Sequence, residues 1–464
     1  MRRISIGLGA ALAAFAVGIW AGASHAGASG HDWTRFGWSP SRTSAPTFAT
    51  GITASSIASL HRRQVQIGGT ADSSPIYLHA VTVNGATHDV FFVTTTYGKT
   101  VAVDANSGAV LWTFTPPGYS SWVGSPQITT ATPVADPSRR FIYAASPGGV
   151  VYKLAVSDGR SVWGVSITKL PSREKIAASL NFFNGRVIAT TGGYIGDAPP
   201  YQGHVAIISA GGRLLHVWNS LCSNRRSLID PGSCGASDSA IWGRAGAVVD
   251  PSNGQLLVAT GNAPWNGSTN WGDAVLRLDV NATRILGNYT PVNTDELSSG
   301  DVDLGSTSPV LIAGFIAQGG KDGRVRLLSK TRMRGTRPHK GGELSVVSTP
   351  SGTDLFTAPA VYKTFLFAAD NGGTAAYRVR NSTLQLVWRN GTGGTSPVVA
   401  GGLVWVYDPS GGLNVYTLGG RRVATLACGG GHWNSPIVVD GRVALPEGNA
   451  NDHATSGVLD IWRR

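Results

Sequence analysis

Few residues of this chain have a type and spacing that would do chemistry by themselves. Asp301 and Asp303 stand in Asp-x-Asp-x-Gly, the pattern of part of a calcium loop, but two carboxylates do not make a calcium site. Tyr97-Gly98-Lys99-Thr100 ends like a phosphate-binding loop, yet Val93 stands where that loop needs Gly, so we interpret it as a strand turn. The chain has no Gly-x-Ser-x-Gly and no His-Glu-x-x-His, and its His residues show no ligand spacing. The motifs of esterases and zinc proteases are therefore absent.

The three cysteines point to one disulfide and no haem. Cys222 and Cys234 lie in a polar loop, residues 221–238, and a bridge between them would stabilise the fold by about 3 kcal/mol. Cys428 is left over, and we expect it to be a buried, small apolar residue rather than a reactive thiol. Because Cys-x-x-Cys-His is missing, the chain carries no covalent haem of its own.

The composition predicts a protein built of β-strands. These strands must therefore position any functional site. Charged residues are 14% of the chain, below the usual value of about 25%, whereas Gly is 62 of 464 residues and Trp is 14. Many Gly together with Val, Thr, Trp and Tyr indicate short strands and tight turns, which makes the protein all-β.

The formal charge of the chain is +12, and one stretch concentrates it. Residues 321–342 hold eight Lys and Arg against the single acid Asp322. This stretch is either a solvated blade edge or a docking face for an acidic redox partner, an anionic cell-wall polymer or a membrane surface. It has no interleaved aromatic residues, so we expect no nucleic acid partner.

A repeat organises the chain. A small or hydroxyl residue, a Pro and an apolar run recur at Ser74-Pro75, Thr132-Pro133, Ser308-Pro309, Ala358-Pro359, Ser396-Pro397 and Ser435-Pro436, with degenerate copies near 177–179 and 244–246. Further apolar runs follow each copy, and a Gly turn and a Trp often close it. Four short strands in each of eight units predict an eight-bladed β-propeller, with the Trp residues packed between blades.

The last copy has only about three strands before the chain ends at Arg464. The run His61–Ile67 precedes the first copy and has no blade of its own. We therefore expect this run to complete the eighth blade as its outer strand, which would remove an open sheet edge.

The beginning of the chain predicts export. Arg2 and Arg3 precede an apolar run, residues 4–23, and Ser24-His25-Ala26 places small residues before a cleavage site. The alternative is an uncleaved membrane anchor, but four Gly in the run make a poor permanent span. No Cys follows, so a lipoprotein is not expected. We thus expect residues 1–26 to be a signal peptide, residues 27–464 to be one domain, and the protein to be periplasmic or secreted and monomeric.

The repeats resemble a known family. His31-Asp-Trp-Thr-Arg-Phe-Gly-Trp-Ser-Pro40 and Asp104-Ala-Asn-Ser-Gly-Ala-Val-Leu-Trp112 are similar to the pyrroloquinoline quinone (PQQ) repeat proteins. These include periplasmic quinoprotein alcohol dehydrogenases, polyvinyl-alcohol dehydrogenase-like proteins and non-catalytic propellers of outer-membrane assembly. The resemblance covers nearly all of residues 27–464, and it implies the fold more strongly than it implies a function.

Three segments imply site residues through this resemblance. Thr260-Gly-Asn-Ala-Pro-Trp-Asn266 resembles the segment whose Asn binds calcium beside PQQ, which implies Asn262 as a metal and cofactor ligand. In the family, the stretch that corresponds to the one beginning at Tyr289 contains the catalytic base. The resemblance therefore implies that either Asp301 or Asp303 is the base. Gly319-Gly-Lys-Asp-Gly323 resembles the turn whose cation polarises the quinone, which implies Lys321.

The chain also departs from the family pattern. Gln127-Ile-Thr-Thr-Ala131 stands where the dehydrogenases have two adjacent Cys, and only Asp197 is available where they have a calcium-binding Glu. The position of the Trp that stacks on the quinone falls on Arg244, whose guanidinium also stacks on planar groups, with Trp242 two residues earlier.

Two functions follow from the resemblance. The first is an exported quinoprotein dehydrogenase that oxidises an alcohol or sugar with PQQ, with or without Ca²⁺, and passes electrons to a separate acceptor. The second is a non-catalytic propeller that binds a protein or polymer of the cell envelope, which the departures favour. The binding of PQQ separates the two.

Overall fold

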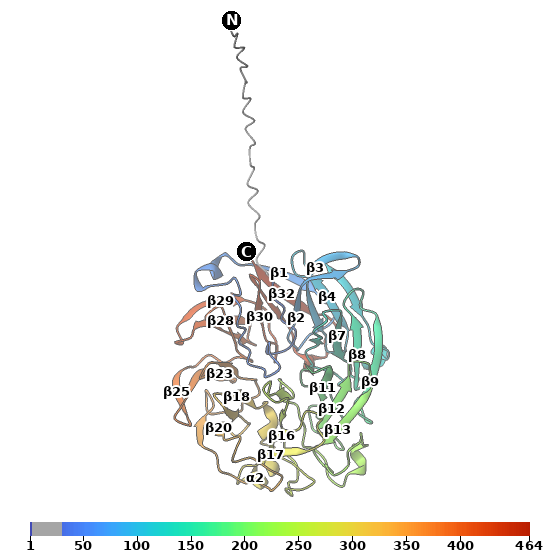
Figure 1. Ribbon diagram of the computed structural model, residues 1–464, viewed down its shortest axis with the longest axis vertical. Helices are drawn as coiled ribbons and strands as arrows, with labels where there is room; N and C mark the ends of the chain where they lie inside the picture. The colour runs from blue at the N-terminus through green and yellow to red at the C-terminus, as the bar shows by residue number, and fades with distance from the viewer. Residues whose placement is uncertain (2–29) are drawn as a thin grey trace. The chain divides into compact units, whose positions relative to one another are not determined.

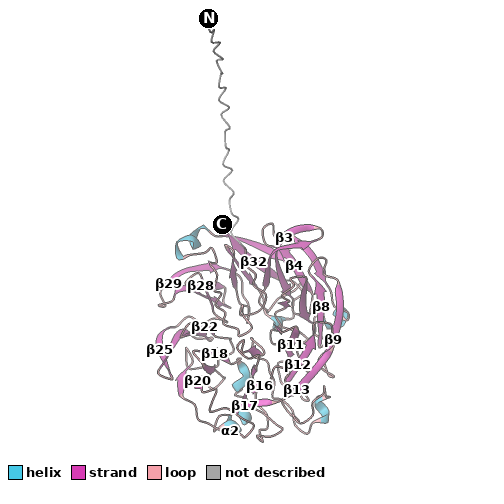
Figure 2. Ribbon diagram, viewed as in Figure 1, coloured by secondary structure: helices cyan, strands magenta, loops and turns pink. Residues whose placement is uncertain are grey.

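The computed structural model describes residues 30–464 together with Met1, and its large compact unit spans His31–Arg464. In this unit eight four-stranded antiparallel sheets follow one another around a ring (Figures 1 and 2). The predicted all-β, eight-bladed propeller is therefore confirmed. The predicted signal peptide, residues 1–26, lies outside the described residues except for Met1. None of the helices described is long and apolar enough to span a membrane.

The first four blades take their strands in chain order. Blade 1 has β2 (Ile76–Val83), β3 (Ala86–Thr94), β4 (Thr100–Asp104) and β5 (Val110–Phe114). Blade 2 has β6 (Val134–Ala135), β7 (Phe141–Ala145), β8 (Val150–Ala155) and β9 (Ser161–Ser166). Blade 3 has β10 (Asn181–Phe183), β11 (Arg186–Thr190), β12 (His204–Ser209) and β13 (Leu214–Asn219). Blade 4 has β14 (Val248–Val249), β15 (Leu256–Ala259), β16 (Val275–Leu278) and β17 (Ile285–Tyr289).

The other four blades include the one that joins both ends of the ring. Blade 5 has β18 (Val310–Ile312), β19 (Phe315–Gln318), β20 (Arg324–Leu328) and β21 (Ser345–Ser348). Blade 6 has β22 (Ala360–Tyr362), β23 (Phe365–Ala369), β24 (Thr374–Arg380) and β25 (Thr383–Asn390). Blade 7 has β26 (Val398–Ala400), β27 (Leu403–Asp408), β28 (Gly412–Thr417) and β29 (Arg422–Ala427). Blade 8 has β30 (Ile437–Val439), β31 (Arg442–Pro446), β32 (Val458–Arg463) and β1 (His61–Gln66).

Helices are short and lie in the connections between strands. In the described residues the α-helices are α1 (Tyr119–Trp122) and α2 (Thr294–Ser299). The 3₁₀ helices are η1 (Ala54–Ser59), η2 (Pro231–Ser233), η3 (Leu304–Ser306) and η4 (Ala450–Asp452).

Each predicted repeat start precedes the first strand of a blade, and first strands of neighbouring blades contact each other at β6 and β10, β18 and β22, β22 and β26, and β26 and β30. Hydroxyl groups at the repeat starts join neighbouring blades, which explains why small hydroxyl residues recur there. These bonds run from Ser74 Oγ to Ser435 O, Thr130 Oγ1 to Ala177 O, Ser308 Oγ to Gly243 O, Thr307 Oγ1 to Thr357 O and Thr395 Oγ1 to Asn434 O.

The ring closes as predicted. Strand β1 pairs antiparallel with β32 from His61–Arg463 to Gln66–Val458, so the N-terminal strand completes the last blade. The Trp residues near the ends of the repeats also contact the next blade. Trp112 Nε1 donates to Val156 O at 2.9 Å, and Trp388 Nε1 donates to Leu418 O at 2.8 Å. Their predicted packing between blades is confirmed.

Residues 31–52 form a segment that crosses the ring, which we call the N-terminal plug. Its backbone or side chains bond to every blade except blade 5. These contacts pair Trp33 with Tyr77, Thr34 with Ala135, Arg35 with Phe182, Pro40 with Val249, Thr43 with Val361, Ser44 with Val399 and Thr50 with Gly441. The blade residues in these pairs lie within or after the first strands, so the plug covers one end of those strands.

Candidate functional site

A cavity of about 690 Å³ lies where the segments before the first strands converge. Six of the predicted site residues line it: Asp197, Trp242, Asn262, Asp301, Asp303 and Lys321. Because these residues come from blades 3, 4 and 5, the packing of these neighbouring blades brings them together. The cavity is therefore our candidate site.

Several of the lining residues come in pairs that are two positions apart in the chain. Such pairs precede the first strands of blades 3, 4, 6 and 8: Lys175 and Ala177, Ala240 and Trp242, Asp354 and Phe356, Gly431 and Trp433. In an extended chain, residues two apart face the same side. This register explains why these side chains all reach the cavity, and it is a signal from which sequence reasoning could have found Lys175, Phe356 and Trp433.

An ion pair of blade 5 forms the charged centre of the cavity. Lys321 Nζ lies 2.6 Å from Asp303 Oδ2 and 3.1 Å from Asp301 Oδ1. The Asp303 side chain is 6% exposed, whereas that of Asp301 is 61% exposed. Burial raises the pKa of Asp303, and the charge of Lys321 opposes this shift. Of the two acids that the sequence left open, Asp303 is thus the one in a buried, polarised environment.

The segment that carries Asn262 holds Asp303 from the other side. The backbone N of Asn262 donates to Asp303 Oδ1 at 2.7 Å. The neighbouring residue must be Gly, because a Cβ on residue 261 would collide with the Asp303 carboxylate. The side-chain amide of Asn262 lines the cavity and makes no hydrogen bond to the described residues, so it is available to a ligand.

Asp273 is a buried acid that sequence reasoning missed. Its Oδ1 accepts from Leu304 N at 2.9 Å, while its Oδ2 has no hydrogen-bond partner among the described residues. Burial raises the pKa of Asp273 to about 8, and the nearby charge of Asp303 acts in the same direction. Asp273 therefore holds its proton at neutral pH, directly behind the segment that begins at Asp303.

Three aromatic side chains form one wall of the cavity. Trp242 contacts Trp433 and Phe356 with ring centroids 5.7 and 6.0 Å apart. Lys321 Nζ lies 5.7 Å from the Trp242 ring centroid. Trp433 also stacks on His432 at 4.1 Å. Such a wall offers flat faces to a planar ligand.

Asp72 anchors this aromatic wall from blade 1. It is fully buried and accepts from His432 Nδ1 at 2.7 Å and from Trp433 N at 2.8 Å. Burial by itself would raise the pKa of Asp72, but the bond to His432 and the charge of Arg244 lower it below the usual value. Asp72 is therefore an ionised, fully engaged carboxylate.

Two of the predicted residues lie differently from the rest. Arg244 is buried and is not among the residues that line the cavity. Its guanidinium donates to Thr130 O and Asp72 O and lies 5.8 Å from the Trp433 ring centroid. Asp197 lines the cavity, but its Oδ1 accepts from the Tyr201 hydroxyl at 2.9 Å.

The donor set fits calcium poorly. Nowhere in the described part of the chain do three His, Cys, Asp or Glu side chains lie together in a way that could hold a metal ion. The ammonium group of Lys321 already lies against both Asp301 and Asp303.

The cysteines follow the prediction in part. Cys222 and Cys234 form the predicted disulfide. Cys428 is half-buried rather than fully buried and packs against the core. Burial raises the pKa of its thiol to about 12, so it is not a thiolate at neutral pH.

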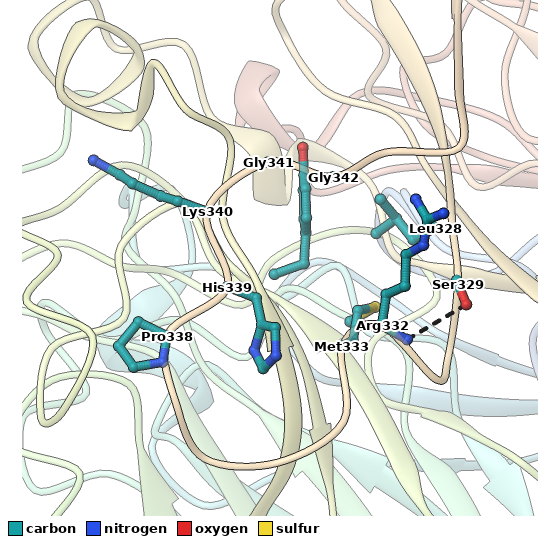
Figure 3. Close-up of a pocket in the computed structure, with 10 residues that line it drawn as sticks. Leu328, Ser329, Arg332, Met333, Pro338, His339, Lys340, Gly341 and Gly342 are labelled. Carbon is teal, nitrogen blue, oxygen red and sulfur yellow. Dashed lines mark hydrogen bonds between the residues drawn. The ribbon is translucent and has the colours of Figure 1, made fainter.

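The basic stretch 321–342 divides into paired and unpaired charges. Lys321, Arg326 and Lys330 pair with Asp303, Asp322 and Asp250. The other five cations make no ion pair with the described residues: Arg324, Arg332, Arg334, Arg337 and Lys340. A second pocket of about 310 Å³ lies in this loop, where Arg332 and Lys340 extend in different directions (Figure 3). Their charges do not converge on one ligand position.

Comparisons with known proteins support the fold. Residues 55–215 match a PQQ-repeat family model described as outer membrane protein assembly factor BamB. No curated protein matches the chain. The solved quinohemoprotein alcohol dehydrogenase from Comamonas testosteroni is 14% identical with a TM-score of 0.69, and the match covers 93% of this chain and 80% of that one.

Two further solved structures show the range of the likeness. A europium-containing methanol dehydrogenase is 14% identical with a TM-score of 0.69, and the match covers 93% of this chain and 98% of that one. BamB from Moraxella catarrhalis is 13% identical with a TM-score of 0.52, over 87% of this chain and 98% of that one. The predicted resemblance is confirmed, and at these identities it concerns the fold.

Proposed function

From the premise that this chain is a PQQ-repeat propeller, we propose that it is a PQQ-dependent dehydrogenase that oxidises an alcohol or sugar. The observation that carries the proposal is the ion pair of buried Asp303 with partly buried Lys321 in a cavity with an aromatic wall. An acid beside a fixed cation and flat aromatic faces suits a planar quinone and the deprotonation of an alcohol. Disulfides are typical of proteins that function outside the cytoplasm, and this chain has one. We therefore include a location outside the cytoplasm in the proposal.

The residues of the cavity fit PQQ, an o-quinone carboxylic acid. Lys321 and the free amide of Asn262 would hold its polar edge, and Trp242 would contact its plane. When bound, PQQ would accept the hydride equivalent of the alcohol. Lys321 would stabilise negative charge that develops on the cofactor oxygens.

Asp303 is the residue that we assign to the alcohol proton. Its Oδ2 faces Lys321 and its Oδ1 accepts from Asn262 N, so the carboxylate is held in one orientation. A carboxylate oxygen accepts more than one hydrogen bond, and an alcohol hydroxyl can therefore donate to Oδ2 beside Lys321. Burial raises the pKa of Asp303, which makes it a stronger base when it is ionised. Because the chain has no haem motif, the electrons would leave to a separate acceptor.

A PQQ titration tests this function. Purified residues 27–464 are titrated with PQQ, with and without Ca²⁺, while the fluorescence of the cavity Trp residues is followed. We expect saturable quenching with micromolar affinity that weakens in Lys321→Ala and Asn262→Ala and is unchanged in Lys169→Ala, an exposed control. If neither condition gives binding, the dehydrogenase proposal is wrong.

A second candidate function is a non-catalytic scaffold for an envelope protein or polymer. The match of residues 55–215 to the BamB-described model and the unpaired cations of the 331–340 loop favour it. It predicts that the protein binds an acidic polymer or protein at low salt, that Arg332→Glu with Arg334→Glu abolishes this binding, and that PQQ has no effect on it. Tight PQQ binding would favour the dehydrogenase instead.

A further inference from the structure

Lys175 is a buried cation in the cavity that the proposed catalysis does not use. It precedes β10 in blade 3, where its N donates to Gly192 O at 2.7 Å and Gly192 N donates to its O at 2.9 Å. The residue is 7% exposed and lines the cavity. The backbone therefore fixes its position, and its side chain ends at the ligand space.

No group of the described chain neutralises this ammonium. Lys175 Nζ makes no hydrogen bond or ion pair with residues 30–464. The charged groups nearest to it are Asp72 and Arg244, and Asp72 is already held by His432 and by the backbone N of Trp433. The other titratable groups on this side of the cavity are Tyr194 and Asp197, and the Asp197 carboxylate is bonded to Tyr201.

A buried charge without a partner is costly, and proteins normally pair it. Here, burial and the repulsion of Arg244 lower the pKa of Lys175 to about 8, with Asp72 opposing the shift. Arg244 is also a buried cation, but its guanidinium donates hydrogen bonds to two backbone carbonyls. A bound anion would supply Lys175 with the partner that the protein itself does not.

We propose that the ammonium group of Lys175 is the counter-ion for a carboxylate of a planar acid bound in the cavity. The aromatic faces of Trp433 and Phe356 lie in the same cavity, which favours a flat ring that carries the carboxylate. Under the proposed function this acid is PQQ, and the inference then rests on that function. The shared chemistry is the aromatic carboxylate, whether it belongs to the cofactor or to another ligand.

Two probes and a pair of variants test the inference. Wild type, Lys175→Met and the exposed control Lys169→Met are titrated with PQQ and with its trimethyl ester by Trp fluorescence. We expect Lys175→Met to bind PQQ at least 30-fold more weakly and Lys169→Met to bind it like wild type. The ester should bind wild type and Lys175→Met with equal affinity. Equal affinity of wild type and Lys175→Met for PQQ overturns the inference and leaves the proposed function intact.

The melting temperature separates loss of the counter-ion from misfolding. Removal of an unpaired buried charge should leave the Tm of ligand-free Lys175→Met equal to or above that of wild type. A large fall in Tm would mean that Lys175 is a structural residue, and the inference would be wrong.

The pH dependence gives an independent test with the conservative variant. Ligand-free Lys175 loses its proton as the pH rises through about 8, so wild-type affinity for PQQ should fall above that pH. Lys175→Arg should keep its affinity at pH 9, because Arg stays charged. A wild-type affinity that is flat from pH 6 to 9.5 contradicts the inference.

The inference can also be tested if the wild-type protein does not bind PQQ. If wild type binds no PQQ, the proposed function fails, and pyridine-2,4-dicarboxylate becomes the probe. Binding of this acid to wild type and its loss in Lys175→Met would keep the inference. Binding of neither acid overturns it.

Discussion

The two ends of the propeller axis bury cations in opposite ways. At the plugged end, Arg42 is 0% exposed and donates to the carbonyls of Phe36, Ser179 and Leu180. At the cavity end, Lys175 is almost as buried, and its ammonium group donates to no described residue. The same ring of blades thus holds one buried cation that backbone carbonyls accept bonds from and another whose ammonium group has no partner among the described residues. Sites of function are where such unpaired, shifted groups gather.

The largest expected effect concerns the chemistry of the cavity end. Asp303→Asn removes the base but keeps the shape, so the activity of the PQQ-loaded enzyme in a dye-linked assay should fall by about 100-fold or more. PQQ affinity, followed by Trp fluorescence, should change little by comparison. Activity close to wild type would remove Asp303 from its assigned role.

The plugged end should respond in stability and not in binding. Arg42→Ala leaves three buried carbonyls without their donor, which should lower the free energy of unfolding by about 3 kcal/mol. Urea unfolding measures this loss, with the exposed Arg421→Ala as the control. PQQ affinity should stay within two-fold. A variant that loses binding but not stability would reverse the contrast between the two ends.

Asp273, at the cavity end, should make the stability of the folded protein depend on pH. Its pKa in the folded protein is raised to about 8, so between pH 4 and 8 the unfolded chain ionises this group while the folded protein keeps it protonated. This share of the stability therefore falls as the pH rises through that range. Asp273→Asn removes the dependence and should gain at least about 2 kcal/mol over wild type on going from pH 5 to pH 8.

Urea unfolding at pH 5 and pH 8 checks the Asp273 prediction. The exposed Asp295→Asn is the control and should follow wild type at both values. If Asp273→Asn and wild type respond equally to pH, Asp273 is not protonated in the folded state.

The smallest expected effect concerns Asp301, the more exposed of the two acids beside Lys321. Asp301 is mostly exposed, and an exposed ion pair contributes at most about 1 kcal/mol. Asp301→Asn should therefore change activity and PQQ affinity by less than about three-fold. An effect as large as that of Asp303→Asn would exchange the roles of the two acids.

Much of the fold was predictable because its signals are local. Ser74-Pro75 and its equivalents mark the start of each first strand, and the run 61–67 has no other blade to complete. The disulfide was predictable because Cys222 and Cys234 share one short loop. The site was predictable only as far as the family resemblance reached, to Asn262 and Lys321 and to a choice between two acids.

The sequence did not show which of the remaining site residues are buried and paired. Asp273 resembles an ordinary polar residue of a strand end in the sequence, and the two-residue register of Lys175 and Ala177 does not show what partners Lys175 has. Arg244 stands where the family places a stacking Trp, but it donates to Asp72 and Thr130 backbone and lies outside the cavity lining. Burial and partners decide these outcomes, and both come from other blades.

The sequence by itself determined the number of blades, the closure of the ring by β1 and the pairing of the cysteines. Each depends on residues that are neighbours in the chain or on the count of repeats. Only the tertiary structure decided that Asp303 is buried and Asp301 exposed, and that the Lys175 ammonium group has no partner among residues 30–464. The physical reason is that the cavity forms where segments from most of the ring converge, and the cost of a buried charge depends on what all of them bring to it.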